Sequence, residues 1–160
     1  MNNKMKRILA VDSGEKRIGL AISDLTGTIA NPLIVIKHIQ REKDAEAIVA
    51  IAIENLVTKI IVGQAFYEDG KPNPSGRKSA RLAKVIQSFT DIPVILWDEY
   101  ESTKIAQEAR REMRVNKKKH HNHMDDLAAT VILQSYLDST VSESNSDNNK
   151  SESDEKIKEN

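Results

Sequence analysis

The sequence has no cysteine among its 160 residues, which excludes a disulfide framework and any thiolate metal site. No apolar run approaches the roughly 18 residues that a membrane span needs. The first residues lack the long apolar block of a secretory signal. Aromatic residues make up only 4%. These absences favour a cytoplasmic protein that has no membrane partner.

The composition that remains, 39% apolar and 30% charged, is typical of one ordinary globular domain. The formal net charge of zero hides an uneven distribution. Residues 139–160 hold six of the 24 acidic and three of the 24 basic residues, so residues 1–138 carry a net charge of +3. Ser, Asn, Asp, Glu and Lys dominate this last segment, which has almost nothing to bury. We predict a folded domain over 1–138 and a disordered polar tail over 139–160.

The first part of the chain predicts three strands, over residues 7–12, 17–24 and about 29–37. They are rich in Ile, Val and Leu, and short gaps that contain glycine separate them. Short gaps predict antiparallel neighbours. The Asn31-Pro32 pair within the third strand predicts a sheet edge or a bulge, because proline cannot donate a ladder hydrogen bond.

The pattern then alternates between helix and strand. Apolar residues at helical spacing predict a helix over 42–57, and short apolar runs predict buried strands over 59–63 and 93–97. Between these strands, a loop with two prolines and two glycines spans residues 64–76. A helix over about 76–89 follows it. Together these elements predict a three-layer α/β domain with a mixed five-stranded sheet.

One cap and two further helices complete the prediction. Ser75 is the predicted cap of the helix over 76–89. Ser102 or Thr103 starts another helix, and Asn122 or Asp125 starts the last one.

Three acidic residues stand at the ends of predicted elements. Asp12 ends the first strand, Glu99 follows the last strand, and Asp125 lies in the first turn of the last helix. If the first, fourth and fifth strands are parallel, their carboxyl ends share the sheet edge where α/β proteins bind ligands. Asp125 aligns with apolar residues on the inner side of its helix. These residues are Ala129, Ile132, Leu133 and Tyr136.

Clustered carboxylates suit hard divalent cations such as Mg²⁺ or Mn²⁺. Two such ions can activate a water and stabilise the leaving oxygen when a phosphodiester is cleaved. Each acid also has a purely structural interpretation. Asp12 fits a turn residue, Glu99 a solvated acid before a helix, and Asp125 an N-cap.

Several motifs in this chain resemble the YqgF/RuvX family of Holliday junction resolvase-like nucleases. Residues 12–19 read DSGEKRIG, similar to the family's D-x-G-x-K-R-I-G opening. Ile60-Ile61-Val62-Gly63, Asp98-Glu99 before Ser102-Thr103, and Asp125 before Ala128-Ala129 continue the resemblance in order. It covers about residues 6–138.

The resemblance implies a ribonuclease H-like fold in which Asp12, Glu99 and Asp125 are the catalytic, metal-binding acids. Asp126 is the alternative to Asp125, because the family position after that acid is usually small. The family implies a nuclease, either one that matures the 5′ end of pre-16S rRNA in ribosomal precursor particles or one that resolves branched DNA. A resolvase that cuts a symmetric junction favours a homodimer, whereas a processing nuclease can be a monomer.

Basic residues lie close to the acids in sequence. Lys16 and Arg17 follow Asp12, and a dense basic segment precedes Asp125. Backbone phosphates supply most nonspecific nucleic-acid affinity, so cations beside metal-binding acids favour RNA or branched DNA as the partner. A solvated charged surface is the alternative. The segment contains Arg110, Arg111, Arg114, Lys117, Lys118 and Lys119.

Other interpretations remain open. A D-x-G turn also meets nucleotide phosphates in sugar kinases and actin-like ATPases, but those usually need two domains. A catalytically inactive nucleic-acid-binding module is the third possibility. His121-Asn122-His123 spells the name of another nuclease class by coincidence, and a zinc site made by His120, His121 and His123 has no evident fourth ligand.

Overall fold

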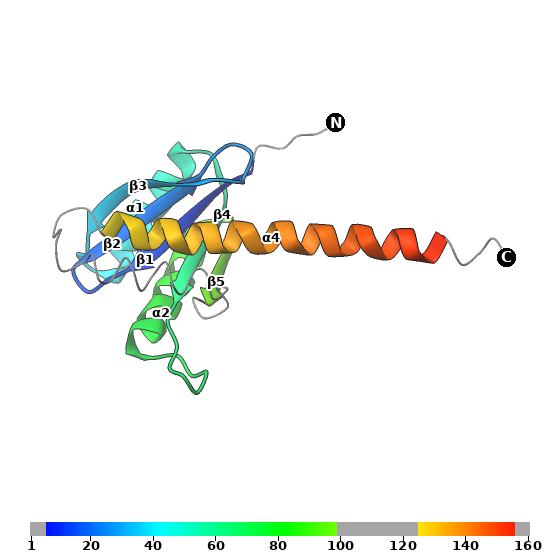
Figure 1. Cartoon of the computed structure of the whole chain (residues 1–160). Helices are drawn as coiled ribbons and strands as arrows, with labels where there is room; N and C mark the ends of the chain where they lie inside the picture. Colours follow the sequence, from blue (N-terminus) through cyan, green and yellow to red (C-terminus); the bar gives the residue numbers. More distant parts are fainter. Residues whose placement is uncertain (1–5, 99–124, 156–160) are drawn as a thin grey trace.

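The computed structural model describes residues 6–98 and 125–155. In this part of the chain, five strands form one mixed sheet, as the sequence predicts, in the order β3-β2-β1-β4-β5. The strands and helices, whose arrangement Figure 1 shows, are β1 Arg7–Ser13, β2 Arg17–Ser23, β3 Ala30–Lys37, α1 Arg41–Glu54, β4 Val57–Gln64, α2 Pro74–Phe89, β5 Val94–Asp98 and α4 Asp125–Glu155. The predicted helix after Ser102 or Thr103 lies outside the described residues.

The strand pairing confirms the predicted directions. β1, β2 and β3 form an antiparallel meander, whereas β4 runs parallel to both β1 and β5. β3 is an edge strand, and its register with β2 shifts so that Leu20 pairs with Ile34 and Ala21 with Pro32. The edge and the irregularity predicted from Asn31-Pro32 are therefore both present.

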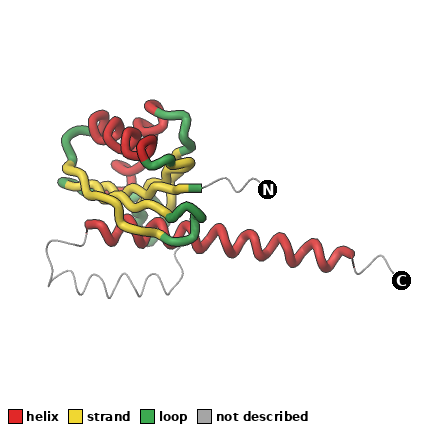
Figure 2. The backbone as a smooth tube through the Cα atoms, turned by 90° about the horizontal axis from the view of Figure 1, so that it is seen from above, coloured by secondary structure: helices red, strands yellow, loops and turns green. Residues whose placement is uncertain are grey.

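Two apolar layers hold the domain together, one on each face of the sheet. Figure 2 shows α1 and α2 on one side of the strands and α4 on the other. On β1, Leu9 and Val11 pack toward α1 and α2, whereas Ile8 and Ala10 pack against α4. This alternation follows from the period of two in a strand. It determines to which face of the sheet each side chain at the sheet edge points.

The ends of α1 and α2 differ from the prediction. α1 stops at Glu54, because Leu56 adopts a left-handed conformation at φ 56° and Val57 already belongs to β4. α2 begins at Pro74, and its cap is Asn73 rather than Ser75. The Asn73 side chain accepts a hydrogen bond from the Gly76 amide at 2.8 Å. Proline suits the first helical position because it has no amide that needs a partner there.

α4 continues to Glu155, past the predicted end of the folded domain at residue 138. Its last core residue is Leu137, and Figures 1 and 2 show the helix extending beyond the sheet after that point. A helix already formed needs no new nucleus to extend, so polar residues can prolong it without burial. The helix differs from the disorder predicted for this segment, while the boundary of the packed domain stays a prediction. No described helix has the length and hydropathy of a membrane span.

Candidate active site

The carboxyl ends of β1, β4 and β5 meet at one edge of the sheet. Val11 of β1 pairs with Val62 of β4, and Gln64 of β4 pairs with Asp98 of β5. Parallel strands place the residues that follow these pairs side by side, where α/β folds bind ligands. Asp12 is therefore at this edge, as the sequence predicts.

The side chain of Asp12 belongs to the face that α4 covers. Ile8 and Ala10, two and four residues earlier, both pack against α4, and residues two apart share a face of the sheet. Asp12 is half-buried and has an interaction partner within the protein. On β4, Ile61 also packs toward α4, so Gly63 lies on this face and adds no side chain beside Asp12.

The neighbouring residue Ser13 faces the other way. Its hydroxyl lies 3.0 Å from the hydroxyl of Ser79 in α2. The turn after it is closed by a hydrogen bond of 2.9 Å from the Gly14 amide to the Arg17 carbonyl. A Cβ atom on Gly14 would stand only 2.7 Å from that carbonyl oxygen, so glycine is needed there. This turn fixes the end of β1 and hence the position of Asp12.

The direction of α4 brings its first residue toward Asp12. Lys59 Nζ donates to the Tyr136 hydroxyl at 3.0 Å, and Lys59 pairs with Ile8 at the start of β1. Tyr136 therefore lies over the start of β1. Asp125 lies eleven residues earlier, about 16 Å back along the helix. From Ile8 to Asp12 the strand covers about 13 Å, similar to the length of helix from Tyr136 back to Asp125. α4 therefore runs in the direction opposite to β1 and begins near the carboxyl end of that strand.

The helix face in line with Asp125 is the packed one. The four residues predicted to share that face are all buried against the sheet, at 7% exposure or less: Ala129, Ile132, Leu133 and Tyr136. Tyr136 also makes an edge-to-face contact with Trp97 of β5, with ring centroids 5.2 Å apart. This contact makes Trp97 part of the packed layer between the sheet and α4.

The predicted trio of acids is only partly within the described chain. Glu99 lies outside the described residues, and α4 begins at Asp125. Asp98 is described, but it alternates with Trp97 and belongs to the α2 face, opposite Asp12. Among the side chains that the structure describes, those of residues 6–98 and 127–143, no three acidic or histidine side chains are grouped as a metal site. Asp12 supplies the carboxylate oxygens that hard cations prefer.

Of the predicted basic residues, too, only some lie within the described chain. Lys16 and Arg17 are exposed at the β1–β2 turn, next to Asp12 in sequence. Arg17 has an interaction partner in the protein. The basic segment from Arg110 to Lys119 and the three histidines after it lie outside the described residues.

The structure adds residues that the sequence did not single out. A cavity on the α1 and α2 side of the same edge is lined by Arg41, Lys78 and Arg81, together with His38 and Asp44. They come from three separate segments, and no motif joins them. The only signal in the sequence was that two of the cations, Lys78 and Arg81, stand three residues apart on one helix face.

Comparisons with known proteins identify one protein family. The family model described as "RuvX: Holliday junction resolvase" matches residues 6–139. A protein of Thermoanaerobacter pseudethanolicus named "Putative pre-16S rRNA nuclease" is 43% identical over 134 residues, which are 83% of this chain and 96% of that protein. A protein of Clostridioides difficile with the same name is 39% identical, over 82% of this chain and 94% of that protein.

A solved structure shares the fold. RuvC of T. thermophilus, in complex with a Holliday junction substrate, superposes with a TM-score of 0.58 at 12% sequence identity. The match covers 86% of this chain and 96% of that one. At this identity the likeness shows the fold alone, and it confirms the ribonuclease H-like three-layer architecture.

Proposed function

Because this chain belongs to the RuvX family, we propose that it is a metal-dependent nuclease that hydrolyses phosphodiester bonds, with the 5′ end of pre-16S rRNA as its substrate. One observation carries the proposal. Asp12 lies at the carboxyl end of β1, on the face that α4 covers. Because α4 begins near this end of β1, the Asp12 carboxylate and the helix start at Asp125 lie toward each other.

In this proposal Asp12, Glu99 and Asp125 hold one or two Mg²⁺ or Mn²⁺ ions, with Asp126 as the alternative on α4. The bound ions would activate a water and stabilise charge on the leaving oxygen. Gly63 keeps the face beside Asp12 free of a bulky side chain, which leaves the phosphate room to approach. Lys16 and Arg17 would attract the phosphate backbone as it arrives.

The partners follow from the same chemistry. The relatives' names favour pre-16S rRNA in a ribosomal precursor particle, and we place the protein in the cytoplasm, where such particles form. The second candidate is resolution of four-way DNA junctions, which the family description favours. The basic segment, Arg110, Arg111, Arg114, Lys117, Lys118 and Lys119, would contact the backbone of either substrate.

The test is cleavage of two labelled substrates by the purified protein with Mg²⁺ or Mn²⁺. One is an RNA that spans the 5′ precursor region of 16S rRNA, and the other is a four-way DNA junction. We expect metal-dependent cutting of the RNA and its loss in Asp12→Asn. Paired symmetric nicks in the junction alone would make the protein a resolvase. Cleavage of neither substrate would leave a nucleic-acid-binding module as the better description.

A further inference from the structure

The cavity beside Ser13 is separate from the proposed metal site. It has a volume of about 340 Å³ and is bounded by the β1–β2 turn, the segment that enters α1, and one face of α2. Ser13 faces this side of the sheet, whereas Asp12 faces α4. The two sites thus share one strand end and occupy opposite faces of it.

Cations surround the cavity. Arg41 comes from the first turn of α1, and Lys78 and Arg81 come from α2. All three are exposed. In the described part of the chain, the side chains of these three residues make no hydrogen bond or ion pair with another residue. Their charges are therefore available to a ligand.

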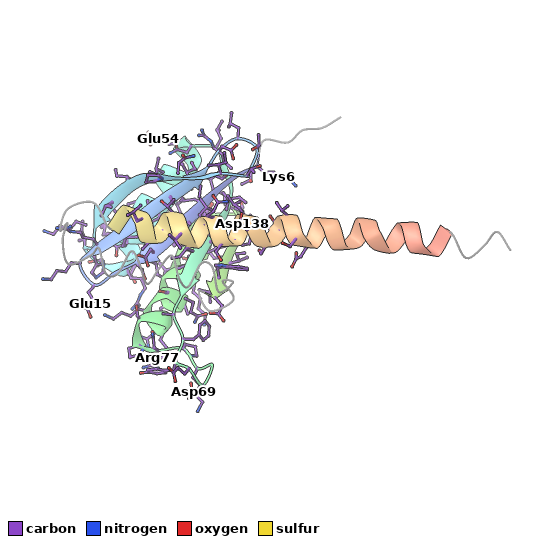
Figure 3. All side chains as sticks on the ribbon, in the orientation of Figure 1. Lys6, Glu15, Glu54, Asp69, Arg77 and Asp138 are labelled. Atoms are coloured by element: carbon purple, nitrogen blue, oxygen red, sulfur yellow. The ribbon has the colours of Figure 1, made fainter. Side chains whose placement is uncertain are left out.

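Two acids, Glu15 and Asp44, also line the cavity, so three cations and two carboxylates leave a formal charge of +1. Asp44 is 3% exposed, and both of its oxygens are occupied. One accepts from the Ile39 amide at 3.0 Å, and the other from His38 Nδ1. Glu15 is exposed, and Figure 3 shows it projecting outward from the β1–β2 turn.

The start of α1 adds donors for an anion, whereas His38 holds the Asp44 carboxylate in the cavity wall. Because Nδ1 of His38 donates to Asp44, Nε2 of the uncharged ring carries a lone pair and offers no proton to an anion. α1 begins at the cavity wall, and the side chain of Gln40, at the N-cap, accepts no hydrogen bond from the helix amides. Helix amides and their dipole favour a negative group at that end.

We propose that this cavity binds a phosphate group of the nucleic-acid substrate, distinct from the phosphate that is cleaved. The proposal rests on the proposed nuclease function, which supplies the ligand. Three cations with a helix start match the chemistry of a phosphate oxyanion. A volume of about 340 Å³ also accommodates the attached sugar, since small-molecule sites begin near 300 Å³.

The test measures binding without cleavage. A fluorescent single-stranded RNA is titrated with protein in EDTA, by anisotropy, at several KCl concentrations between about 50 and 200 mM. Lys78→Gln and Arg81→Gln are compared with Lys84→Gln, an exposed cation of the same helix that does not line the cavity. Each cavity variant should reduce the slope of log K against log salt by about 0.7 and raise Kd by roughly three- to tenfold. Lys84→Gln should leave both unchanged.

A second measurement identifies the source of the phosphate. Inorganic phosphate, added to the ¹⁵N-labelled protein, should shift the amide signals of Gly14 and Gln40, and Arg41→Gln should abolish the shift. Shifts with phosphate but an unchanged RNA salt slope would overturn the assignment to nucleic acid and indicate a small phosphorylated ligand. No shift and no change of slope would overturn the site itself.

These outcomes are distinguishable from failure of the nuclease proposal. Asp12→Asn should bind RNA in EDTA with the same salt slope as the unmodified protein. If the unmodified protein binds RNA through the cavity yet cleaves nothing with metal, the nuclease mechanism fails while the phosphate site stands.

Discussion

The hydroxyl groups of Ser13 and Ser79 lie 3.0 Å apart and tie the end of β1 to α2. Ser79 also donates to the Ser75 carbonyl at 3.1 Å, so its single proton is used and Ser13 is the donor in the pair. Ser79 is buried at 3% exposure. The pair anchors Ser13 on the α2 side and thereby holds Asp12 on the α4 side.

Ser79→Ala should therefore destabilise the protein by about 1 kcal/mol, because the Ser13 hydroxyl loses its acceptor. Urea unfolding gives the free energy. In the double variant Ser13→Ala/Ser79→Ala, the loss in free energy of unfolding should be less than the sum of the two single losses, because both changes break the same hydrogen bond. Ser88→Ala, whose exposed hydroxyl bonds only within α2, is the matched control and should change little. Strict additivity would contradict a direct bond.

Leu56 predicts a stabilising substitution. It follows α1 at φ 56°, a left-handed conformation that costs an L-residue about 1 kcal/mol, and its side chain is 76% exposed. Leu56→Gly should raise the free energy of unfolding by up to about 1 kcal/mol. Ile53→Gly, at a 62% exposed position inside α1, should instead lower it by about 1 kcal/mol. Equal losses from both would contradict the conformation at Leu56.

Asp24 should make stability depend on acid pH. The Ile29 amide, the Thr26 hydroxyl and the Thr28 amide all donate to its carboxylate and lower its pKa from 3.8 to about 2. A carboxyl whose pKa is lower when folded stabilises the protein above the unfolded value and stops doing so as pH falls through the folded value. This stabilisation is therefore present above about pH 4 and lost toward pH 2.

The measurement compares the unmodified protein with Asp24→Asn by thermal unfolding from pH 5 down to pH 2. The difference in Tm should be largest at pH 5 and shrink as the pH approaches 2. Asp91→Asn removes one exposed negative charge before β5 and controls for net charge. A Tm difference that stays constant with pH would show that the charge of Asp24 does not contribute to stability.

The polar half of α4 should contribute little to stability. The last α4 residue in the core is Leu137, and Val141 is 52% exposed. Removal of residues 143–160 should leave the urea midpoint unchanged, since the described core contacts of α4 end at Leu137, while the helical circular dichroism signal falls. A large drop in the midpoint would mean that the packed domain extends beyond residue 138.

The sequence predicted the sheet well because its signals are local. The strand periods and the glycine-containing gaps predicted the strands and the antiparallel meander, and Asn31-Pro32 predicted the edge strand. The position of β4 between β1 and β5 came from the structure. The helix ends were less accurate, because the left-handed turn at Leu56 and the Asn73 cap depend on neighbours in space. The cavity could not be predicted at all, since Arg41 and Arg81 meet only through packing of α1 against α2.

The placement of Asp12 predicts a difference between two acids at the same sheet edge. Asp12 faces α4, whereas Asp98 at the end of β5 faces α2. Asp12→Asn should reduce metal-dependent cleavage by about a hundredfold or more, because it removes a proposed metal ligand. Asp98→Asn should keep kcat/KM within about threefold. Circular dichroism should show both variants folded, and Mn²⁺ titration should weaken only for Asp12→Asn. Equal losses of cleavage in the two variants would contradict a site on the α4 face of the sheet.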